Sequence, residues 1–368
     1  MRPTYAEINL KNLLFNYSQI RKKTKTKIIA VVKADSYGHG MIECVNALKN
    51  HAHPPEYYAV ALFEEAMELN LSKVTDKPIL CFAPIDFDQL NDYITFNIIA
   101  TITDIVQLKV LSKLKLNGIL NIHIKLDSGM GRVGVKPSDL IPFIKKLKSI
   151  DNINIDGIYT HFATSDEADK SFAKFQLDNF KTMVETIKEN GINTNLIHAA
   201  NSGAIIDMPE AYFDAVRPGI ALYGYYPSQE TSRSIDLKPV MSLKSRITSI
   251  KKINKGESVS YGRLFIADED TTVATVPIGY ADGYNRNLTN KAIGFIGEKI
   301  VNQVGRVTMD RILFEIKDKS IKLGSKITLM GNTGEMKFDA DDWSNILNTI
   351  PYEITCNISK RVPRVYIK

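Results

Sequence analysis

The chain has 368 residues, of which 44% are hydrophobic and 24% charged, and its formal net charge is +6. This length exceeds one ordinary core, so we expect two domains. No apolar run approaches the roughly 20 residues that cross a membrane. The start, Met1 to Thr4, lacks the apolar region of a secretory signal, and three scattered cysteines favour a reducing compartment. We therefore expect a cytoplasmic protein without a membrane segment.

The densest basic cluster, residues 21–27, follows an amphipathic stretch over residues 8–17. Positive charge is favourable at the end of a helix, so the cluster is predicted to end a helix there. A nucleic-acid site is not expected, because no pattern of aromatic and basic residues accompanies the cluster.

Eight β-rich runs alternate with helix-like stretches in the first two thirds of the chain. The runs cover residues 28–33, 57–62, 78–82, 97–101, 120–126, 155–161, 195–199 and 213–217. The amphipathic stretches between them include residues 105–116, 140–150 and 172–190. This alternation predicts an α/β fold with a closed (β/α)8 barrel of the TIM type, and an open doubly wound sheet is the alternative.

After Pro227 the pattern changes to short β-rich segments separated by glycine or charged turns. These segments cover residues 241–253, 271–277, 293–301, 304–307, 313–316 and 326–329. They predict a second, mostly antiparallel β domain. We place the barrel at residues 1–234 and the β domain at residues 235–368.

Lys33 stands where the first predicted strand ends. Burying an amine is costly unless the amine is neutralised or used, and a desolvated lysine can form an imine with an aldehyde cofactor. The alternative is a lysine that extends to solvent from the strand edge. Tyr37 then offers a hydroxyl nearby, and Gly38 and Gly40 let the backbone pass close to a ligand.

Polar residues also follow the later strands, at the barrel edge where active sites are built. The loops after strands seven and eight often hold a phosphate, and here they contain Asn201-Ser202 and Arg217-Pro218-Gly219-Ile220. The Ser202 hydroxyl and the backbone N–H groups around Gly219 and Ile220 are the predicted phosphate donors. An ordinary helix cap at Ser202 is the alternative.

The segment VVKADSYGHG, residues 31–40, resembles the cofactor-lysine segment of alanine racemases, which bind pyridoxal 5′-phosphate (PLP). Further similar motifs are RPGIALYG (217–224), SVSYGR (258–263), IGYADG (278–283) and VGRVTMD (304–310). The resemblance covers nearly the whole chain and implies a barrel joined to a β domain, to which the first eight residues add a strand. The cofactor-binding residues that it implies are Lys33, Tyr37, His161, Asn201, Ser202, Arg217, Gly219, Ile220 and Lys360.

The resemblance also implies roles around the cofactor. Arg217 would face the pyridine nitrogen and disfavour a proton there, because arginine stays charged. Pairing of Arg217 with Asp214 or another carboxylate is the structural alternative. Arg132 would contact the cofactor's phenolic oxygen and the substrate carboxylate, and Lys125, as a carbamate, would orient Arg132. A plain ammonium at Lys125 is the other possibility.

Racemisation needs a proton-transfer group on each face of a planar carbanion, and Lys33 serves only one face. By resemblance, Tyr261 from a partner subunit serves the other face, with Tyr280 at the entrance and Met309 and Asp310 near the substrate. This implies a homodimer with shared sites and no metal. The alternative for Tyr261 is a buried tyrosine of the β domain.

Two positions depart from the family pattern: Thr308 replaces a usual cysteine, and Lys360 stands where many members have tyrosine. The resemblance predicts interconversion of L- and D-alanine, which supplies D-alanine for bacterial cell-wall peptide. Because that tyrosine limits room beside the substrate methyl, Lys360 leaves a serine or broad-specificity racemase as the alternative. An amino-acid decarboxylase and a non-catalytic PLP-binding protein are the more distant possibilities.

Overall fold

The computed structural model describes residues 2–368, which divide into two compact units. The first unit, the barrel unit, contains residues 14–36 and 41–237. The second, the β unit, contains residues 2–13, 37–40 and 238–368. Within residues 2–368, no helix combines the length and the apolar character that a membrane crossing requires.

Eight parallel strands close into a barrel, which confirms the predicted TIM-type fold and excludes the open sheet. Each strand pairs in parallel with the next along the chain, and β2 pairs with β9 to close the ring. The strands are β2 (Lys27–Val31), β3 (Tyr57–Val60), β4 (Ile79–Pro84), β5 (Ile98–Ile102), β6 (Leu120–Lys125), β7 (Ile153–Tyr159), β8 (Leu196–His198) and β9 (Ala215–Val216).

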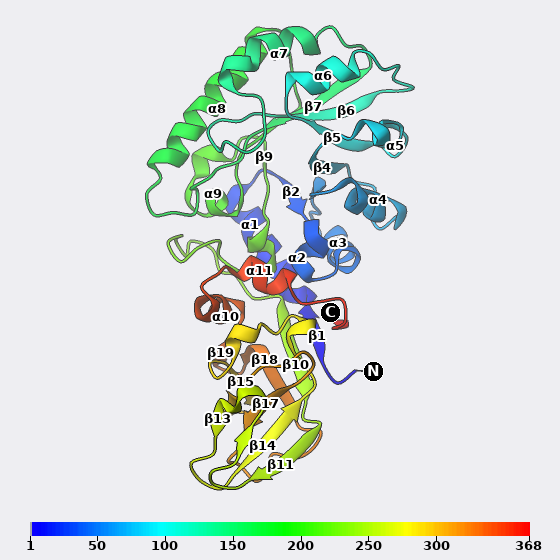
Figure 1. Ribbon diagram of the computed structural model, residues 1–368. Helices are drawn as coiled ribbons and strands as arrows, with labels where there is room; N and C mark the ends of the chain where they lie inside the picture. The colour runs from blue at the N-terminus through cyan, green and yellow to red at the C-terminus, as the bar shows by residue number, and fades with distance from the viewer. Residues whose placement is uncertain (1) are drawn as a thin grey trace. The chain divides into compact units, whose positions relative to one another are not determined.

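Helices follow most of these strands, and Figure 1 shows α4 to α8 on the outside of the barrel strands. α1 ends with three basic residues in its last turn, as the basic cluster predicted. The helix expected over residues 105–116 is shorter in the structure, where α6 ends at Leu111. The helices are α1 (Leu10–Thr24), α2 (Lys33–Gly38), α3 (Met41–Lys49), α4 (Phe63–Leu71), α5 (Leu90–Thr95), α6 (Ile105–Leu111), α7 (Leu140–Leu147), α8 (Ser171–Glu189) and α9 (Ser202–Asp207).

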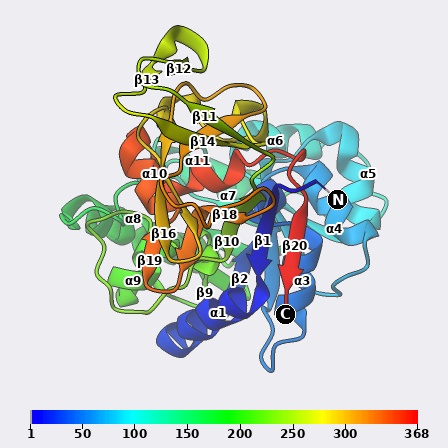
Figure 2. The same cartoon turned by 90° about the horizontal axis from the view of Figure 1, so that it is seen from below.

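The β unit is built on one large, mostly antiparallel sheet in the order β11-β14-β17-β16-β15-β18-β10-β1-β20. β1 pairs antiparallel with β10 and parallel with β20, and Figure 2 shows β1 and β20 side by side. The strands of this sheet are β1 (Tyr5–Asn9), β10 (Met241–Arg246), β11 (Ser249–Ile253), β14 (Thr271–Val276), β15 (Ile293–Ile296), β16 (Lys299–Val304), β17 (Ile312–Glu315), β18 (Lys326–Thr333), β19 (Met336–Phe338) and β20 (Arg364–Ile367).

Four details of the β unit differ from the sequence prediction. The single run expected over residues 241–253 is split into β10 and β11, and the run over 293–301 is the hairpin β15–β16, which turns at Gly297 with a positive φ of 60°. Residues 305–307 lie outside any strand. Two helices, α10 (Ala340–Leu347) and α11 (Pro351–Cys356), were not predicted.

Candidate active site

Lys33 is the first residue of α2, two residues after β2 ends at Val31, and it is half-buried. The four residues that follow it, Ala34 to Tyr37, all have φ between 51° and 54°. Such left-handed backbone costs roughly 1–2 kcal/mol for each non-glycine residue. A strained turn of this kind persists only where surrounding bonds hold it, and strain of this kind clusters at functional sites.

Two carboxylates hold the beginning of this left-handed turn. Glu65 Oε1 accepts a hydrogen bond from Ala34 N over 2.6 Å, and Glu65 Oε2 accepts from Ala61 N over 2.8 Å. Asp35 Oδ1 accepts from Met41 N over 2.7 Å. Glu65 thus ties the residue after Lys33 to the start of α4, a contact that the sequence analysis missed.

The chain from Tyr37 to Gly40 packs within the β unit. A Cβ at Gly38 would lie 2.2 Å from the Thr355 carbonyl oxygen, and one at Gly40 would lie 1.9 Å from the Tyr366 hydroxyl. Both glycines are therefore required by close approach. Tyr37 itself is buried beside Tyr352, with ring centroids 5.9 Å apart, and burial raises its pKa well above the ordinary value.

Arg217 is buried at the carboxyl end of β9 without a carboxylate partner among the described residues. Its guanidinium donates to His198 Nδ1 over 2.7 Å, to the Thr160 carbonyl over 2.6 Å and to the Ala199 carbonyl over 2.8 Å. The alternative pairing with Asp214 is wrong, because the Asp214 carboxylate accepts from Ile197 N instead. Burial lowers the pKa of Arg217 to about 10, so it remains a cation near neutral pH.

His161 is surrounded by positive charge. Its Nδ1 lies 3.4 Å from Arg217 NH2. Burial and then the charges of Arg217, Lys125, Arg132 and Lys33 hold its pKa well below the ordinary value. The structure thus brings these five predicted residues into one region of the barrel unit.

Lys125 is buried at the end of β6 and donates to its neighbour, the Leu126 carbonyl, over 2.8 Å. Burial, followed by the charge of Arg217, lowers its pKa to about 7, although Asp127 acts in the opposite direction. A substantial neutral fraction near pH 7 makes this amine able to react with carbon dioxide. As an ammonium, Lys125 only donates, as Arg132 does, so the two side chains cannot hydrogen-bond to each other.

The loop that carries Arg132 is closed by Asp127. The Asp127 carboxylate accepts from the backbone N–H groups of Gly129 and Gly131 over 3.1 and 3.0 Å. Gly134 has a φ of 129°, and a Cβ there would lie 2.7 Å from Asp127 N. This tight loop leaves Arg132 exposed, so its guanidinium is open to a ligand.

Ser202 joins the loops that follow β8 and β9. Its Oγ accepts from Gly219 N over 3.0 Å and from Ala221 N over 3.3 Å. The alternative of a helix cap at Ser202 is wrong: the cap of α9 is Asn201, whose side chain accepts from Ala204 N over 3.1 Å. Ile220, the first residue of the short 3-10 helix Ile220–Tyr223, lies between the two donors.

These residues of the barrel unit fit PLP. Four basic side chains, those of Lys33, Lys125, Arg132 and Arg217, gather around His161, and the Asp127 carboxylate acts on Lys125. An anionic ligand offsets such charge. Lys33 supplies an amine that can react with an aldehyde, and Arg217 supplies a cation that can face a ring nitrogen. The hydroxyl of Ser202 and the backbone N–H groups near Ile220 are suited to a phosphate.

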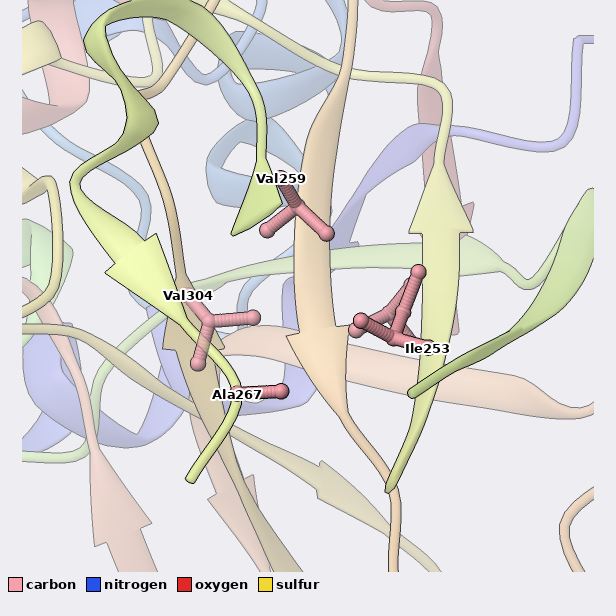
Figure 3. Close-up of a cluster of buried hydrophobic side chains, with 5 residues drawn as sticks. Ile253, Val259, Ala267 and Val304 are labelled. Atoms are coloured by element: carbon pink, nitrogen blue, oxygen red, sulfur yellow. The ribbon is translucent and has the colours of Figure 1, made fainter. Parts of the chain in front are cut away.

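Tyr261 lies in the β unit and its side chain is 72% exposed, which excludes the reading of a buried core tyrosine. It lies in the turn between β12 (Ser258–Val259) and β13 (Phe265–Ile266), which form a two-stranded ribbon at the edge of the unit in Figure 2. Figure 3 shows Val259, the last residue of β12, in a cluster of buried side chains with Ile253, Ala267 and Val304. This buried cluster anchors a segment whose tip presents Tyr261.

Two motifs that were separate in the sequence are joined beside Tyr261. Tyr280 N donates to the Thr308 carbonyl over 3.0 Å, and Ala281 N donates to the Met309 carbonyl over 3.1 Å. A Cβ at Gly279 would lie 2.2 Å from the Thr308 carbonyl oxygen, so glycine is required for this contact. The packed motifs bring Tyr280 and Met309 to the same surface.

An open cleft within the β unit collects four predicted residues: Tyr261, Tyr280, Met309 and Asp310. Arg286, Arg306 and Arg311 also line it, and the sequence analysis missed them. Arg306 lies inside the motif VGRVTMD and Arg311 directly follows it, so this motif was the signal that could have found both residues. The cleft is therefore rich in positive charge, which suits an anionic substrate group.

Lys360 is exposed in the turn before β20. Its neighbour Arg361 pairs with Asp310, with NH2 2.7 Å from Oδ1, and with Asp282, with Nε 3.3 Å from Oδ1. Asp310 is thus partly neutralised by Arg361, a partner that the sequence motifs did not indicate.

Comparison with known proteins agrees with this arrangement. The family model "Alanine racemase, N-terminal domain" matches residues 8–227, and "Alanine racemase, C-terminal domain" matches residues 240–366. The chain is 43% identical to the alanine racemase of Clostridium tetani, over 100% of this chain and 96% of that protein. It is 41% identical to alanine racemase 1 of Clostridium acetobutylicum, with the same coverage of both chains.

Solved structures agree as well. The alanine racemase of Clostridium difficile 630 matches with a TM-score of 0.92 at 37% identity, over 99% of this chain and 96% of that one. The alanine racemase of Bacillus anthracis with bound L-Ala-P matches with a TM-score of 0.92 at 33% identity, over 100% and 96%. Sequence and fold agree along the full length, and the chain belongs to the alanine racemase family, whose members are PLP enzymes.

Proposed function

We propose that the chain interconverts L- and D-alanine by proton transfer at two faces of the substrate, in a homodimer that shares its active sites. PLP, when bound, supplies an electron-withdrawing ring that stabilises negative charge at the substrate α-carbon. Lys33 holds the cofactor and moves the proton on the face of the D substrate. Tyr261 of the partner subunit moves the proton on the face of the L substrate.

The single observation that carries this proposal is the state of Arg217, a buried cation bonded to a histidine and two carbonyl groups but to no carboxylate. A cation beside the ring nitrogen keeps that nitrogen unprotonated, which limits charge delocalisation and so limits side reactions. The related decarboxylases usually place a carboxylate there, so Arg217 favours a racemase over a decarboxylase.

The other residues of the site bind the cofactor and hold its orientation. Ser202, Asn201, Gly219 and Ile220 hold the phosphate region, with Tyr37 and Lys360 as further contacts to it. His161 lies beside the ring as a neutral imidazole, because its pKa is held low by burial and surrounding cations.

On the substrate side, Arg132 binds the substrate carboxylate, and Lys125, as a carbamate, orients Arg132. Met309 N, Asp310 and Tyr280 line the approach to the substrate. All of these contacts position the amino acid for proton transfer at its α-carbon.

The exposure of Tyr261 supports the shared site. A catalytic phenol that is 72% exposed in its own chain needs another surface to exclude water from it. A second copy related by a two-fold axis supplies that surface twice, once for each site. We place the dimer in the cytoplasm, where D-alanine is made available for cell-wall peptide.

The experiment that tests the proposal compares racemisation of L-alanine and L-serine by the purified protein with added PLP. Alanine turnover well above serine turnover supports the proposal, and serine turnover at least equal to alanine supports the broad-specificity alternative. Lys360→Tyr is the matched variant: it should lower serine turnover relative to alanine. Lys33→Ala is the negative control and should abolish turnover in both directions, together with the absorbance of lysine-bound cofactor.

A further inference from the structure

A continuous chain of hydrogen-bonded side chains runs through the barrel unit from Arg217 to Asp156. Arg217 NH1 lies 2.7 Å from His198 Nδ1, and His198 Nε2 lies 3.0 Å from His123 Nδ1. His123 Nε2 then lies 3.0 Å from Asp156 Oδ2. The four residues come from β9 and its following loop, β8, β6 and β7, and we call them the Asp156–Arg217 chain.

The chemistry of the groups fixes the direction of every bond in this chain. A guanidinium only donates, so His198 Nδ1 must accept. A neutral His198 then carries its proton on Nε2 and donates it to His123 Nδ1. His123 in turn carries its proton on Nε2 and donates it to the Asp156 carboxylate. No other assignment of protons satisfies all three contacts.

Burial supports neutral imidazoles at both positions. His123 and His198 are fully buried, and burial lowers the pKa of each, with the charge of Arg217 adding to the effect at His198. The ring of Tyr159 stacks on His198, with centroids 5.0 Å apart and an interplanar angle of 4°. This stacking holds the plane of the imidazole that accepts from Arg217.

The far end of the chain carries negative charge. Burial raises the pKa of Asp156, but hydrogen bonds from His123 and Tyr57 outweigh it and lower the pKa below the ordinary value. The Asp156 side chain is 17% exposed. The charge that compensates Arg217 is thus placed two imidazole rings away from it.

The backbone is shaped to admit His123. A Cβ at Gly157 would lie 2.6 Å from His123 Nε2, which no side chain there allows. The pairing of β6 with β7 also shifts register between Ile122 and His123, an irregularity that redirects a side chain. Two independent backbone features therefore serve the His123 position.

We propose that Asp156, His123 and His198 are positioning residues for catalysis, which hold Arg217 in one orientation and in its cationic state toward the cofactor ring. Arg217 uses NH1 for His198 and NH2 for Thr160 and Ala199, and His161 Nδ1 also lies 3.4 Å from NH2. These contacts do not use the Nε–H group or the second N–H of NH1. A carboxylate placed directly on Arg217 would weaken its field at the ring nitrogen. This inference rests on the proposed function, because it assigns these residues an effect on that reaction.

The test uses the full-length holoenzyme and apoenzyme with nitrogen-15 labelled histidine. Long-range proton–nitrogen NMR spectra report which ring nitrogen carries the proton, and His123→Gln and His198→Gln assign the signals by their loss. Asp156→Asn keeps the shape of the side chain but adds an N–H donor, so the proton direction of the chain is no longer fixed. Asp214→Asn is the control, because Asp214 accepts only a backbone N–H and lies outside the chain.

The expected wild-type spectrum shows His123 and His198 neutral, protonated at Nε2 and unprotonated at Nδ1. Asp156→Asn should add Nδ1-protonated signals and lower kcat about tenfold while KM changes less than about twofold. If Asp156→Asn does not fold, Gly157→Ala replaces it as the test, because its methyl group pushes His123 aside. This variant should also lower kcat about tenfold while KM changes less than about twofold. Asp214→Asn should leave both the tautomers and kcat unchanged.

Two results would overturn the proposal: a proton on Nδ1 of either histidine in the wild type, or altered tautomers in Asp156→Asn with kcat equal to that of Asp214→Asn. The spectra need no turnover, so they test the hydrogen-bond chain separately from the reaction. A wild-type protein with the expected tautomers but no alanine turnover would contradict the proposed function and with it the catalytic role of the chain.

Discussion

Ser202 Oγ accepts a hydrogen bond from Gly219 N over 3.0 Å, which links the loop after β8 to the loop after β9. The two residues are buried, so this bond is not exchanged for one with water. It fixes the backbone at the place where we propose that the phosphate of PLP binds.

Ser202→Ala should therefore weaken cofactor binding and stability together. Removing the hydroxyl leaves two buried N–H groups without their acceptor, which costs roughly 1–3 kcal/mol. We expect PLP affinity to fall about tenfold or more, as measured by fluorescence titration of the apoenzyme, and the melting temperature to fall. Ser138→Ala, an exposed serine, is the control, and equal cofactor affinity in both variants would contradict this role of Ser202.

Glu65 should support the left-handed turn after Lys33. Glu65→Ala removes the acceptor for the N–H groups of Ala34 and Ala61, so we expect a loss of roughly 1–3 kcal/mol in the free energy of unfolding and a lower kcat. Chemical denaturation and steady-state kinetics measure these effects. The neighbouring Glu64→Ala, at an exposed position, should change neither, and equal behaviour of the two variants would refute the role of Glu65.

The strain of the same turn predicts a substitution that stabilises the protein. Ala34 has a φ of 51°, where glycine has no steric penalty. Ala34→Gly should raise the free energy of unfolding by about 0.5–1 kcal/mol, after the larger entropy of unfolded glycine is subtracted. Ala47→Gly, in the right-handed helix α3, should lower it by about 1 kcal/mol. Changes of the same sign in the two variants would contradict the left-handed conformation.

The lowered pKa of Lys125 predicts a pH-dependent reaction with carbon dioxide. Only the neutral amine attacks carbon dioxide, and with a pKa of about 7 the neutral form grows as pH rises through that value. Carbon NMR with labelled bicarbonate should show a carbamate signal at pH 8 that is weaker at pH 6. Lys125→Arg should lack the signal at both pH values.

The lowered pKa of Lys125 also predicts that the free energy of unfolding depends on pH. In the unfolded chain the amine titrates near its ordinary value of about 10.4, so the unfolded state binds more protons between about pH 7 and 10. Lys125 therefore destabilises the fold fully below about pH 7, and this cost is relieved as pH rises to about 10. The stability difference between wild type and Lys125→Met should shrink over that window, and a constant difference would contradict the lowered pKa.

The barrel was predictable from the sequence because short, mostly hydrophobic runs alternate with amphipathic stretches such as residues 140–150 and 172–190. The split of residues 241–253 into two strands was not, since Ile247 and Thr248 continue the same apolar and polar alternation. Helix α10 was missed although Asp339 and Asp342 form a capping box around its first turn. That local signal was present in the sequence.

The site was predictable where a motif carries it, as for Lys33 and Arg217. The left-handed turn was not, because Ala34 and its neighbours are residues that rarely adopt positive φ and leave no sequence signal. His123 and Asp156 were missed because each is one of several polar residues within a β-rich run, and only the barrel brings them together. The register of strand pairing and the closure of the barrel decide such contacts, and both depend on residues that are far apart in the sequence.

Tyr261→Phe gives the most direct test of two-face proton transfer. The variant keeps the ring but removes the hydroxyl, so Lys33 should still exchange the α-proton of D-alanine with deuterated water, while exchange from L-alanine and racemisation in both directions should fall by at least about a hundredfold. Proton NMR of each enantiomer in deuterated water measures all three rates in one preparation. Rapid exchange from L-alanine, at the rate seen with D-alanine, would contradict the assignment of Tyr261 as the base for the L substrate.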